Sequence, residues 1–327
     1  MVTRRNLLYT LIAISLVLII INISVEVATR KVETTIPTIS KNEIETKFAV
    51  TLSSYGICSD WIKKVYVKQH LSDSLNYLFN ISIPNDILIA TLLKDINNMF
   101  VDLPVVIKSA EKKNHSNSVL KIYSNDVLKL QANLKHSSKV LREFAEYSFL
   151  VYVNPEDVET PINKASKIFY DFTYLLVPTK ISNKIKNEIK KNYDILLNDQ
   201  IIDHEYSLKE EFSKQKLINN IRTIILTFGK DRLYLIDENS TLFKSKIFSL
   251  LRDEFGSRGI KLKALQSYNK IEGNTPEQLN SLLNFYSTSL KGKKGKTFVI
   301  ELNNFITLSP TIENYIKKGY KVVEVVN

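Results

Sequence analysis

The sequence predicts an α/β fold in which an incomplete or distorted (β/α) barrel follows a small α+β domain. Apolar runs rich in strand formers alternate with helical segments through the second half of the chain, which is the pattern of a mostly parallel sheet. The number and spacing of these runs suit a barrel better than a two-layer fold, although a doubly wound sheet stays open. The runs end near residues Asn154, Val177, Asn198, Phe228, Asp237, Leu265 and Asn303.

The composition is that of a folded protein with about two domains of ~150 residues each, since 44% of its 327 residues are hydrophobic and 24% are charged. Cys58 is the only cysteine, which excludes an intramolecular disulfide and a zinc site built from several thiolates. The net charge of +11 comes mostly from lysines on predicted helix surfaces. These lysines are either solvated or attracted to anionic lipids or acidic envelope polymers. We expect no nucleic-acid partner, because no basic-aromatic sheet motif or recognition helix is found.

The N-terminus predicts a membrane anchor. Arg4 and Arg5 precede an uncharged apolar segment, residues 7–24, which begins with Leu7, ends with Ser24 and is close to the ~20 residues that cross a bilayer. A cleaved signal peptide stays open, but the segment is longer than a usual signal core and no convincing cleavage site follows it. We interpret residues 1–28 as an uncleaved signal anchor in the cytoplasmic membrane. The single span would place the C-terminal domain in the periplasm or outside the cell, after a polar tether over residues 29–46.

Residues 47–138 predict the small α+β domain. Strands are expected over residues 61–69, 80–83, 105–109, 118–123 and 127–134, and an amphipathic helix begins after Pro84. Ser124, Asn125 and Asp126 predict a hairpin turn between the last two strands.

Residues 139–327 predict the barrel domain, which opens with a charged helix over residues 139–147. Its central element is the apolar run 233–236, which ends in Asp237 and Glu238, with Ser240 or Thr241 at the N-cap of a following helix. Parallel sheets bind ligands at the carboxyl ends of their strands, so Asp237 stands where a site is expected.

The ordered series of strand ends resembles the divergent polysaccharide deacetylase family of bacteria. The resemblance covers roughly residues 147–327 and is carried by the segments 172–178, 193–198, 227–229, 233–238 and 297–303. It implies a distorted barrel outside the cytoplasmic membrane, related to metal-dependent enzymes that remove acetyl groups from envelope sugars. Such enzymes use a metal ion to polarise the amide carbonyl and a carboxylate or histidine to move protons.

This chain departs from the family pattern at most of the matching positions. Asn154, Asn198, Thr227 and Asn303 stand where the family has acidic or histidine residues, and Asp237 is the one matching acid that is retained. Asparagine and threonine are poor proton shuttles and poor replacements for imidazole at a zinc-like ion. The resemblance therefore implies a pseudoenzyme without metal or cofactor, whose catalytic residues, if it has any, are unknown.

Two hypotheses follow. The first is a catalytically silent domain that binds envelope glycan or an envelope protein in a cleft shared by Asn154, Asn198, Thr227, Asp237 and Asn303. Tyr152, Phe228 and Phe305 are candidate apolar platforms beside that cleft. The second is an active deacetylase whose shifted metal site draws on the cluster Asp199, Asp203, His204 and Glu205. A scaffold without a glycan ligand is a variant of the first hypothesis. The basic segment 291–296 lacks the glycine spacing of a phosphate loop and predicts a flexible turn.

Overall fold

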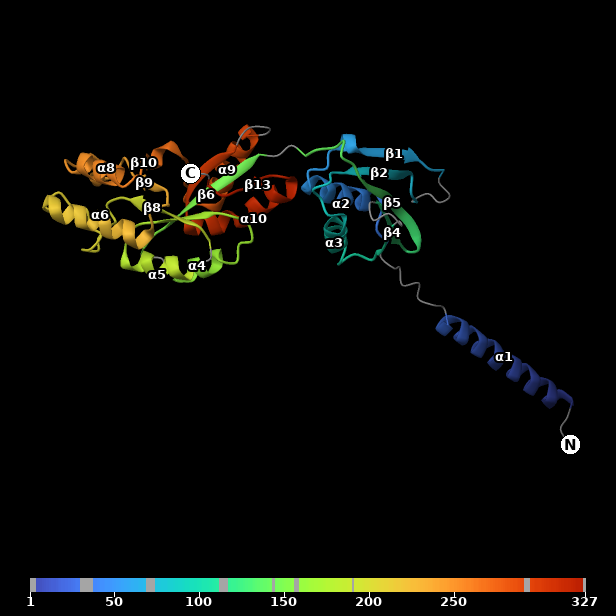
Figure 1. The fold of residues 1–327 in the computed structure, drawn as a ribbon. Helices are drawn as coiled ribbons and strands as arrows, with labels where there is room; N and C mark the ends of the chain where they lie inside the picture. Colours follow the sequence, from blue (N-terminus) through green and yellow to red (C-terminus); the bar gives the residue numbers. More distant parts are fainter. Residues whose placement is uncertain are drawn as a thin grey trace. The chain divides into compact units, whose positions relative to one another are not determined.

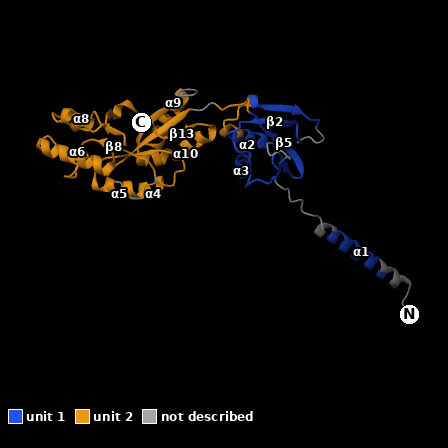
Figure 2. Ribbon diagram, in the orientation of Figure 1, with its two compact units in different colours: residues 1–51, 60–137 blue, residues 52–59, 138–327 orange. Residues whose placement is uncertain are grey.

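The computed structural model describes residues 4–29, 38–68, 74–111, 117–142, 145–155, 159–189, 191–290 and 295–325. The chain forms two compact units, one of residues 1–51 and 60–137 and the other of residues 52–59 and 138–327 (Figure 2). Each unit has its own sheet. The basic segment 291–296 falls largely outside the described residues.

The N-terminal helix α1 (Arg4–Thr29) contains the apolar segment of the predicted anchor. Its aliphatic side chains Leu16, Leu18 and Ile20 are exposed. Within the part of the chain that the structure describes, no helix combines the length and the apolarity that crossing a membrane requires. The anchor therefore stays a prediction from the sequence.

Helix α2 (Lys41–Ser54) corrects the predicted tether, because it already covers residues 41–46. Its buried face carries Ile44, Phe48 and Leu52, whose spacing of four residues places them on one side of the helix. Glycine and proline are absent from this segment. The polar residues that suggested a tether form the exposed side of the helix.

The first unit is a five-stranded sheet in the order β1-β2-β5-β4-β3. Strands β2 and β5 are parallel, and the other neighbours are antiparallel. Helices α2 and α3 (Ile89–Met99) contribute buried side chains to the unit, and Phe48 of α2 packs against Phe79 of β2 with ring centroids 6.1 Å apart. The strands are β1 (Ile62–Tyr66), β2 (Tyr77–Ile83), β3 (Val106–Glu111), β4 (Asn117–Ser124) and β5 (Val127–His136). The β4–β5 turn has Asn125 and Asp126 at φ 50° and 59°, so the predicted hairpin is confirmed.

The second unit is a parallel sheet in the order β10-β9-β8-β7-β6-β12-β11, with β13 paired to β6. Figure 1 labels β6, β8, β9, β10 and β13 of this sheet. The spatial order follows the chain from β6 to β10, and β12 then returns to the other side of β6. This is the cyclic order of a barrel that is open between β10 and β11, whereas a doubly wound sheet would place β11 beside β6. The strands are β6 (Glu146–Val153), β7 (Thr173–Leu176), β8 (Tyr193–Leu197), β9 (Tyr234–Ile236), β10 (Leu262–Ala264), β11 (Asn269–Ile271), β12 (Lys296–Glu301) and β13 (Lys321–Val322).

Helices cover the outer face of this curled sheet (Figure 1). Aromatic side chains fill the layer between them: Phe149 of β6 lies against Phe305 of α10 with centroids 5.4 Å apart, and Tyr234 of β9 lies 5.3 Å from Phe255 of α8. The helices are α4 (Glu159–Ala165), α5 (Lys180–Glu188), α6 (Lys214–Phe228), α7 (Thr241–Lys244), α8 (Phe248–Ser257), α9 (Pro276–Leu290) and α10 (Leu302–Lys318). The helix predicted over residues 139–147 is wrong, because strand β6 begins at Glu146 and six of its eight residues are buried.

Candidate functional site

A cleft lies on the inner face of the open barrel, at the carboxyl ends of its strands. Strand register puts Tyr152 opposite Leu175 of β7 on one side and Glu301 of β12 on the other, so these side chains share one face. The cleft has a volume of about 240 Å³. Its apolar wall consists of Leu175, Leu196, Leu265, Val299 and Ile300, and its polar residues are Tyr152, Asn198, Asp237, Lys270, Glu272, Glu301 and Asn304.

The turn after β9 holds Asp237 at the edge of this cleft. Asp237 Oδ1 accepts hydrogen bonds from Gln266 Nε2 at 2.6 Å and from the backbone N–H of Asn239 at 2.9 Å. Gln266 Oε1 in turn accepts from the N–H of Glu238 at 3.0 Å. Ser240 is the N-cap of α7, as predicted, and its side chain accepts from Phe243 N. Asp237 is thus held by the turn and by Gln266, while a different residue caps the helix.

Asn198, which follows β8, and Tyr152 of β6 are joined through Gln200 beside the cleft. Asn198 Oδ1 accepts from the N–H of Gln200 at 3.0 Å, and the Tyr152 hydroxyl donates to Gln200 Oε1. Burial raises the pKa of Tyr152, and the nearby charges of Glu301 and Asp237 raise it further, whereas hydrogen bonds with Asn198 and Gln200 oppose the shift. Tyr152 therefore stays a neutral hydroxyl near neutral pH, with its proton directed to Gln200, and it cannot serve as a general base there.

The opposite wall comes from β11, the end of β12 and the start of α10; the strand that is β12 was predicted from the sequence, but β11 was missed. Lys270 Nζ pairs with Glu272 Oε1 at 3.0 Å. Glu301 is the last residue of β12, and Asn304 lies in the first turn of α10, because that helix begins directly at Leu302. The alternation Lys270, Glu272 around the buried Ile271 was the available signal for a strand here.

The structure brings two of the five predicted residues, Asn198 and Asp237, into this cleft. Asn154 follows β6 and Asn303 follows β12 at the same sheet edge, but neither lines the cleft. Asn304 takes the place expected for Asn303.

Thr227 and two of the aromatic platforms were predicted wrongly. Thr227 lies in the last turn of α6, near the amino ends of the strands, where the hydroxyl of Tyr193, the first residue of β8, donates to the carbonyl of Phe228 at 3.0 Å. Phe228 and Phe305 are fully buried in the core, so they cannot be ligand platforms. Tyr152 is the predicted platform that does line the cleft.

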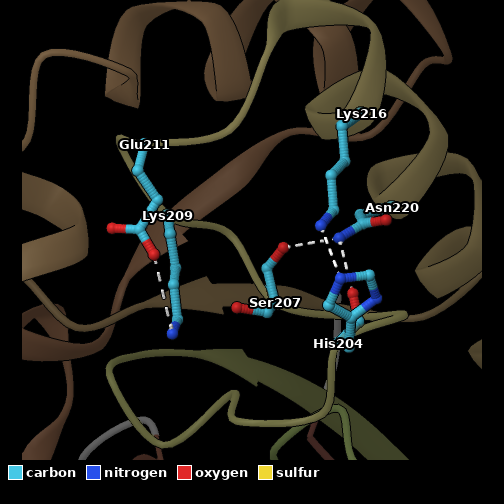
Figure 3. Close-up of polar contacts among 6 residues, drawn as sticks. All are labelled: His204, Ser207, Lys209, Glu211, Lys216 and Asn220. Atoms are coloured by element: carbon cyan, nitrogen blue, oxygen red, sulfur yellow. Dashed lines mark hydrogen bonds and ion pairs between the residues drawn. The ribbon is translucent and has the colours of Figure 1, made fainter.

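The acidic cluster after β8 does not converge on one point. Asp203 Oδ2 accepts from the N–H of Lys180 at 2.7 Å, and Asp199 binds the start of α7. Nε2 of His204 lies 2.6 Å from Lys216 Nζ, and Figure 3 shows the imidazole facing that lysine and α6. In the described part of the chain, no three His, Cys, Asp or Glu side chains form a group that could hold a metal ion.

The residues of the barrel unit do not fit the metal that the family resemblance implies. Between residues 138 and 327 the sequence contains a single histidine, His204, and no cysteine. His204 is held beside Lys216, and its ring also lies 6.0 Å from that of Phe212. At the cleft itself, Asp237 Oδ1 already accepts two hydrogen bonds and Glu272 pairs with Lys270. A zinc-like ion would find no imidazole there.

A second cavity of about 410 Å³ adjoins the cleft and shares Asn198 with it. Asp199 lines this cavity and accepts from Thr241 N at 2.8 Å, Thr241 Oγ1 at 2.7 Å and Leu242 N at 3.0 Å. Partial burial opposes ionisation of Asp199, but these hydrogen bonds and Lys244 outweigh it and lower its pKa. Asp199 therefore anchors the start of α7 as a carboxylate.

Asp194 is a buried acid on the inner face of β8, two residues before Leu196 of the cleft wall. Its Oδ1 accepts from Leu233 N at 3.0 Å. Burial raises the pKa of Asp194 to about 6, against the opposing effects of that hydrogen bond and of Arg232 and Lys263.

No protein-family model and no curated protein matches this chain. Among solved structures, the catalytic domain of peptidoglycan N-acetylglucosamine deacetylase from Eubacterium rectale is similar at 12% identity and a TM-score of 0.40, over 57% of this chain and 90% of that one. A Streptococcus mutans CE4 esterase is similar at 12% identity and a TM-score of 0.37, over 57% of this chain and 87% of that one. The strand-end segments resemble the divergent polysaccharide deacetylase family, and a peptidoglycan deacetylase is among the solved structures to which this chain is similar.

Proposed function

We propose that the barrel unit binds a glycan of the cell envelope in the strand-end cleft and does not hydrolyse it. The observation that carries the proposal is the lining of the cleft: an apolar wall of leucine, valine and isoleucine beside amide, carboxylate and phenol groups. Sugars carry both apolar C–H faces and hydroxyl groups, so they need both kinds of surface. Asn198, Asn304 and Glu301 can accept from sugar hydroxyls, and the two amides can also donate.

The chemistry of the lining residues supports binding without turnover. Hydrolysis of an N-acetyl group needs an activated water and a group that moves protons near neutral pH. Asn198 and Asn304 do not titrate in that range, and the raised pKa of Tyr152 keeps it protonated. Oδ1 of Asp237 accepts hydrogen bonds from Gln266 and from the backbone of its own turn.

In this proposal the predicted N-terminal anchor determines on which side of the membrane the glycan is bound. Residues 7–24 would hold the chain in the cytoplasmic membrane, and Arg4 and Arg5 would keep the short N-terminal end inside. Protease added to spheroplasts should then digest both folded units. Protection of these units, while a control protein outside the membrane is cut, would contradict the anchored topology.

A pair of neighbouring asparagines gives a matched test of the cleft. N-acetylglucosamine oligomers or peptidoglycan fragments would be titrated into the full-length chain by calorimetry, with acetate release measured in parallel. Asn304→Ala should weaken binding about fivefold to tenfold, as expected for the loss of a hydrogen bond worth about 1 kcal/mol. Asn303→Ala, one residue away and outside the lining, should bind as the wild type does.

Three outcomes would contradict the proposal. Equal losses for both variants would show that the cleft does not bind the sugar. Acetate release that is abolished by Asp237→Ala would make the protein a deacetylase. An absence of binding by the wild-type chain to every fragment would favour a scaffold without a glycan ligand.

A further inference from the structure

The open face of the sheet in the first unit is a basic surface that the barrel cleft does not involve. Rows of paired residues cross this face: Lys63, Asn80, Asn133 and Val119 form one row, and Ser82, Lys135 and Asn117 form the next. The opposite face is the core, where Phe79 packs against Phe48 of α2. Because side chains alternate along a strand, the two faces have separate residue sets.

A hollow of about 350 Å³ lies on this open face. Within it, Asn133 Nδ2 donates to Asn80 Oδ1 at 2.8 Å across the parallel pair β2–β5. Each of these amides has further donor and acceptor positions. The buried Asn117 Oδ1, in the next row, has no hydrogen-bond partner among the described residues. Residue Asn117 also lines the hollow, so a third amide side chain contributes to its polar lining.

The charge of the face has one sign. Lys63 and Lys135 line the hollow, and a further row extends it through Lys121 of β4 and Lys108 of β3. Lys63, Lys108 and Lys135 are exposed. None of the described residues in these three rows is acidic. The first row is Lys63, Asn80, Asn133, Val119 and Ala110, and the second is Ser82, Lys135 and Asn117. The third row is Val65, Leu78, Gln131, Lys121 and Lys108.

We propose that this face binds an acidic polysaccharide, with the lysines pairing to its carboxylates and the amides Asn80, Asn117 and Asn133 binding its hydroxyls. Charge complementarity selects a polyanion. The amide-lined hollow favours a ligand that carries hydroxyl groups as well as charge. Single-stranded nucleic acid fits less well, because it requires exposed aromatic rings for base stacking and the ring of Tyr123 is covered by Lys108 at 5.3 Å.

The test compares polymers that differ in one property. Oligogalacturonate would be titrated into the full-length chain at low ionic strength, beside its methyl ester, poly-glutamate and vesicles containing phosphatidylserine. Oligogalacturonate should bind at least tenfold more tightly than the uncharged ester, which shares its backbone, and than poly-glutamate, which lacks hydroxyls. Added salt should weaken its binding. Equal binding of poly-glutamate or of the vesicles would overturn the proposal in favour of general attraction to anions.

Variants then locate the site. Lys63→Glu/Lys135→Glu should reduce oligogalacturonate affinity at least tenfold. Lys94→Glu/Lys180→Glu, which changes the net charge equally on exposed positions of α3 and α5, should reduce it less than threefold. Asn133→Ala should weaken the binding of oligogalacturonate but leave the binding of poly-glutamate unchanged. Equal effects of the two charge variants, with both folded by circular dichroism, would overturn the assignment. Because oligogalacturonate lacks N-acetyl groups, failure here is distinguishable from failure of the cleft proposal.

Discussion

Gln266 clamps Asp237: its Nε2 donates to Asp237 Oδ1 at 2.6 Å while its Oε1 accepts from the N–H of the next residue, Glu238, at 3.0 Å. One side chain thus ties the β9–α7 turn to η2 (Leu265–Ser267), the short helix between β10 and β11. This link lies where the barrel is open and no strand ladder joins β10 to β11. The position of Asp237 in the cleft depends on it.

Gln266→Leu should lower the free energy of unfolding by about 1–3 kcal/mol, since it removes one of the two hydrogen bonds to Asp237 Oδ1 and leaves the backbone N–H of Glu238 in a half-buried turn without its partner. Gln266→Glu should lower the free energy of unfolding more at neutral pH than at pH ~4. The substitution places two carboxylates face to face, and they repel each other unless one is protonated. Urea unfolding at both pH values measures the effect. A loss below about 0.5 kcal/mol for both variants would mean that the clamp does not stabilise the turn.

Asp194 should make the protein less stable as pH rises through about 6. Its folded pKa is raised, so in this range the folded state binds more protons than the unfolded state, whose aspartate has a pKa of about 3.9. The stabilising effect of the neutral carboxyl is fully present below pH ~4 and is lost as pH rises through the folded pKa.

Asp194→Asn removes this dependence while keeping an acceptor for Leu233 N. The stability difference between variant and wild type should shift in favour of the variant, by on the order of 2–3 kcal/mol, between pH ~4 and pH ~7.5. Only the change with pH is diagnostic, because a constant offset reports packing. A difference that is flat over this range would show that Asp194 titrates as an ordinary exposed acid.

Asp199 should have the opposite pH dependence. Its pKa is lowered in the folded state, so its contribution is present above the unfolded pKa of about 3.9 and is lost as pH falls through the folded value. Asp199→Ala removes three hydrogen bonds at the start of α7 and should lower the free energy of unfolding by about 1–2 kcal/mol at pH 7. Thermal unfolding at pH 7 and pH 3 checks both statements. A larger cost at pH 3 would contradict them.

The sequence allowed the barrel and the β9 turn to be predicted because their signals are local. The run Tyr234–Ile236 is apolar, and polar residues with a capping serine follow it. Strand, turn and helix therefore each have a signal within a few residues.

Thr227 was assigned wrongly because a short apolar run can belong to either a strand or a helix. The longer window resolves it: Leu217, Ile221, Ile224 and Phe228 recur at three or four residues and are buried, and Gly229 ends the helix at φ 97°. Asn303 missed the cleft because α10 starts without an intervening loop, so helical rotation places Asn304 there instead. Gln266 lies in the three-residue helix η2, Lys270 lies in the three-residue strand β11, and Glu272 follows β11 directly. Elements this short give only a weak local signal, such as the alternation around Ile271, and their positions depend on tertiary contacts.

The central claim is that the strand-end cleft holds a glycan without hydrolysing it. The most direct measurement is mass spectrometry of an N-acetylglucosamine oligomer recovered after prolonged incubation with the full-length chain, at a protein concentration where calorimetry shows the oligomer to be bound. We predict that the recovered oligomer retains every acetyl group, with or without added zinc, and that Asn304→Ala releases it from the protein. Recovery of a deacetylated oligomer, or binding that is unchanged in Asn304→Ala, would contradict this account.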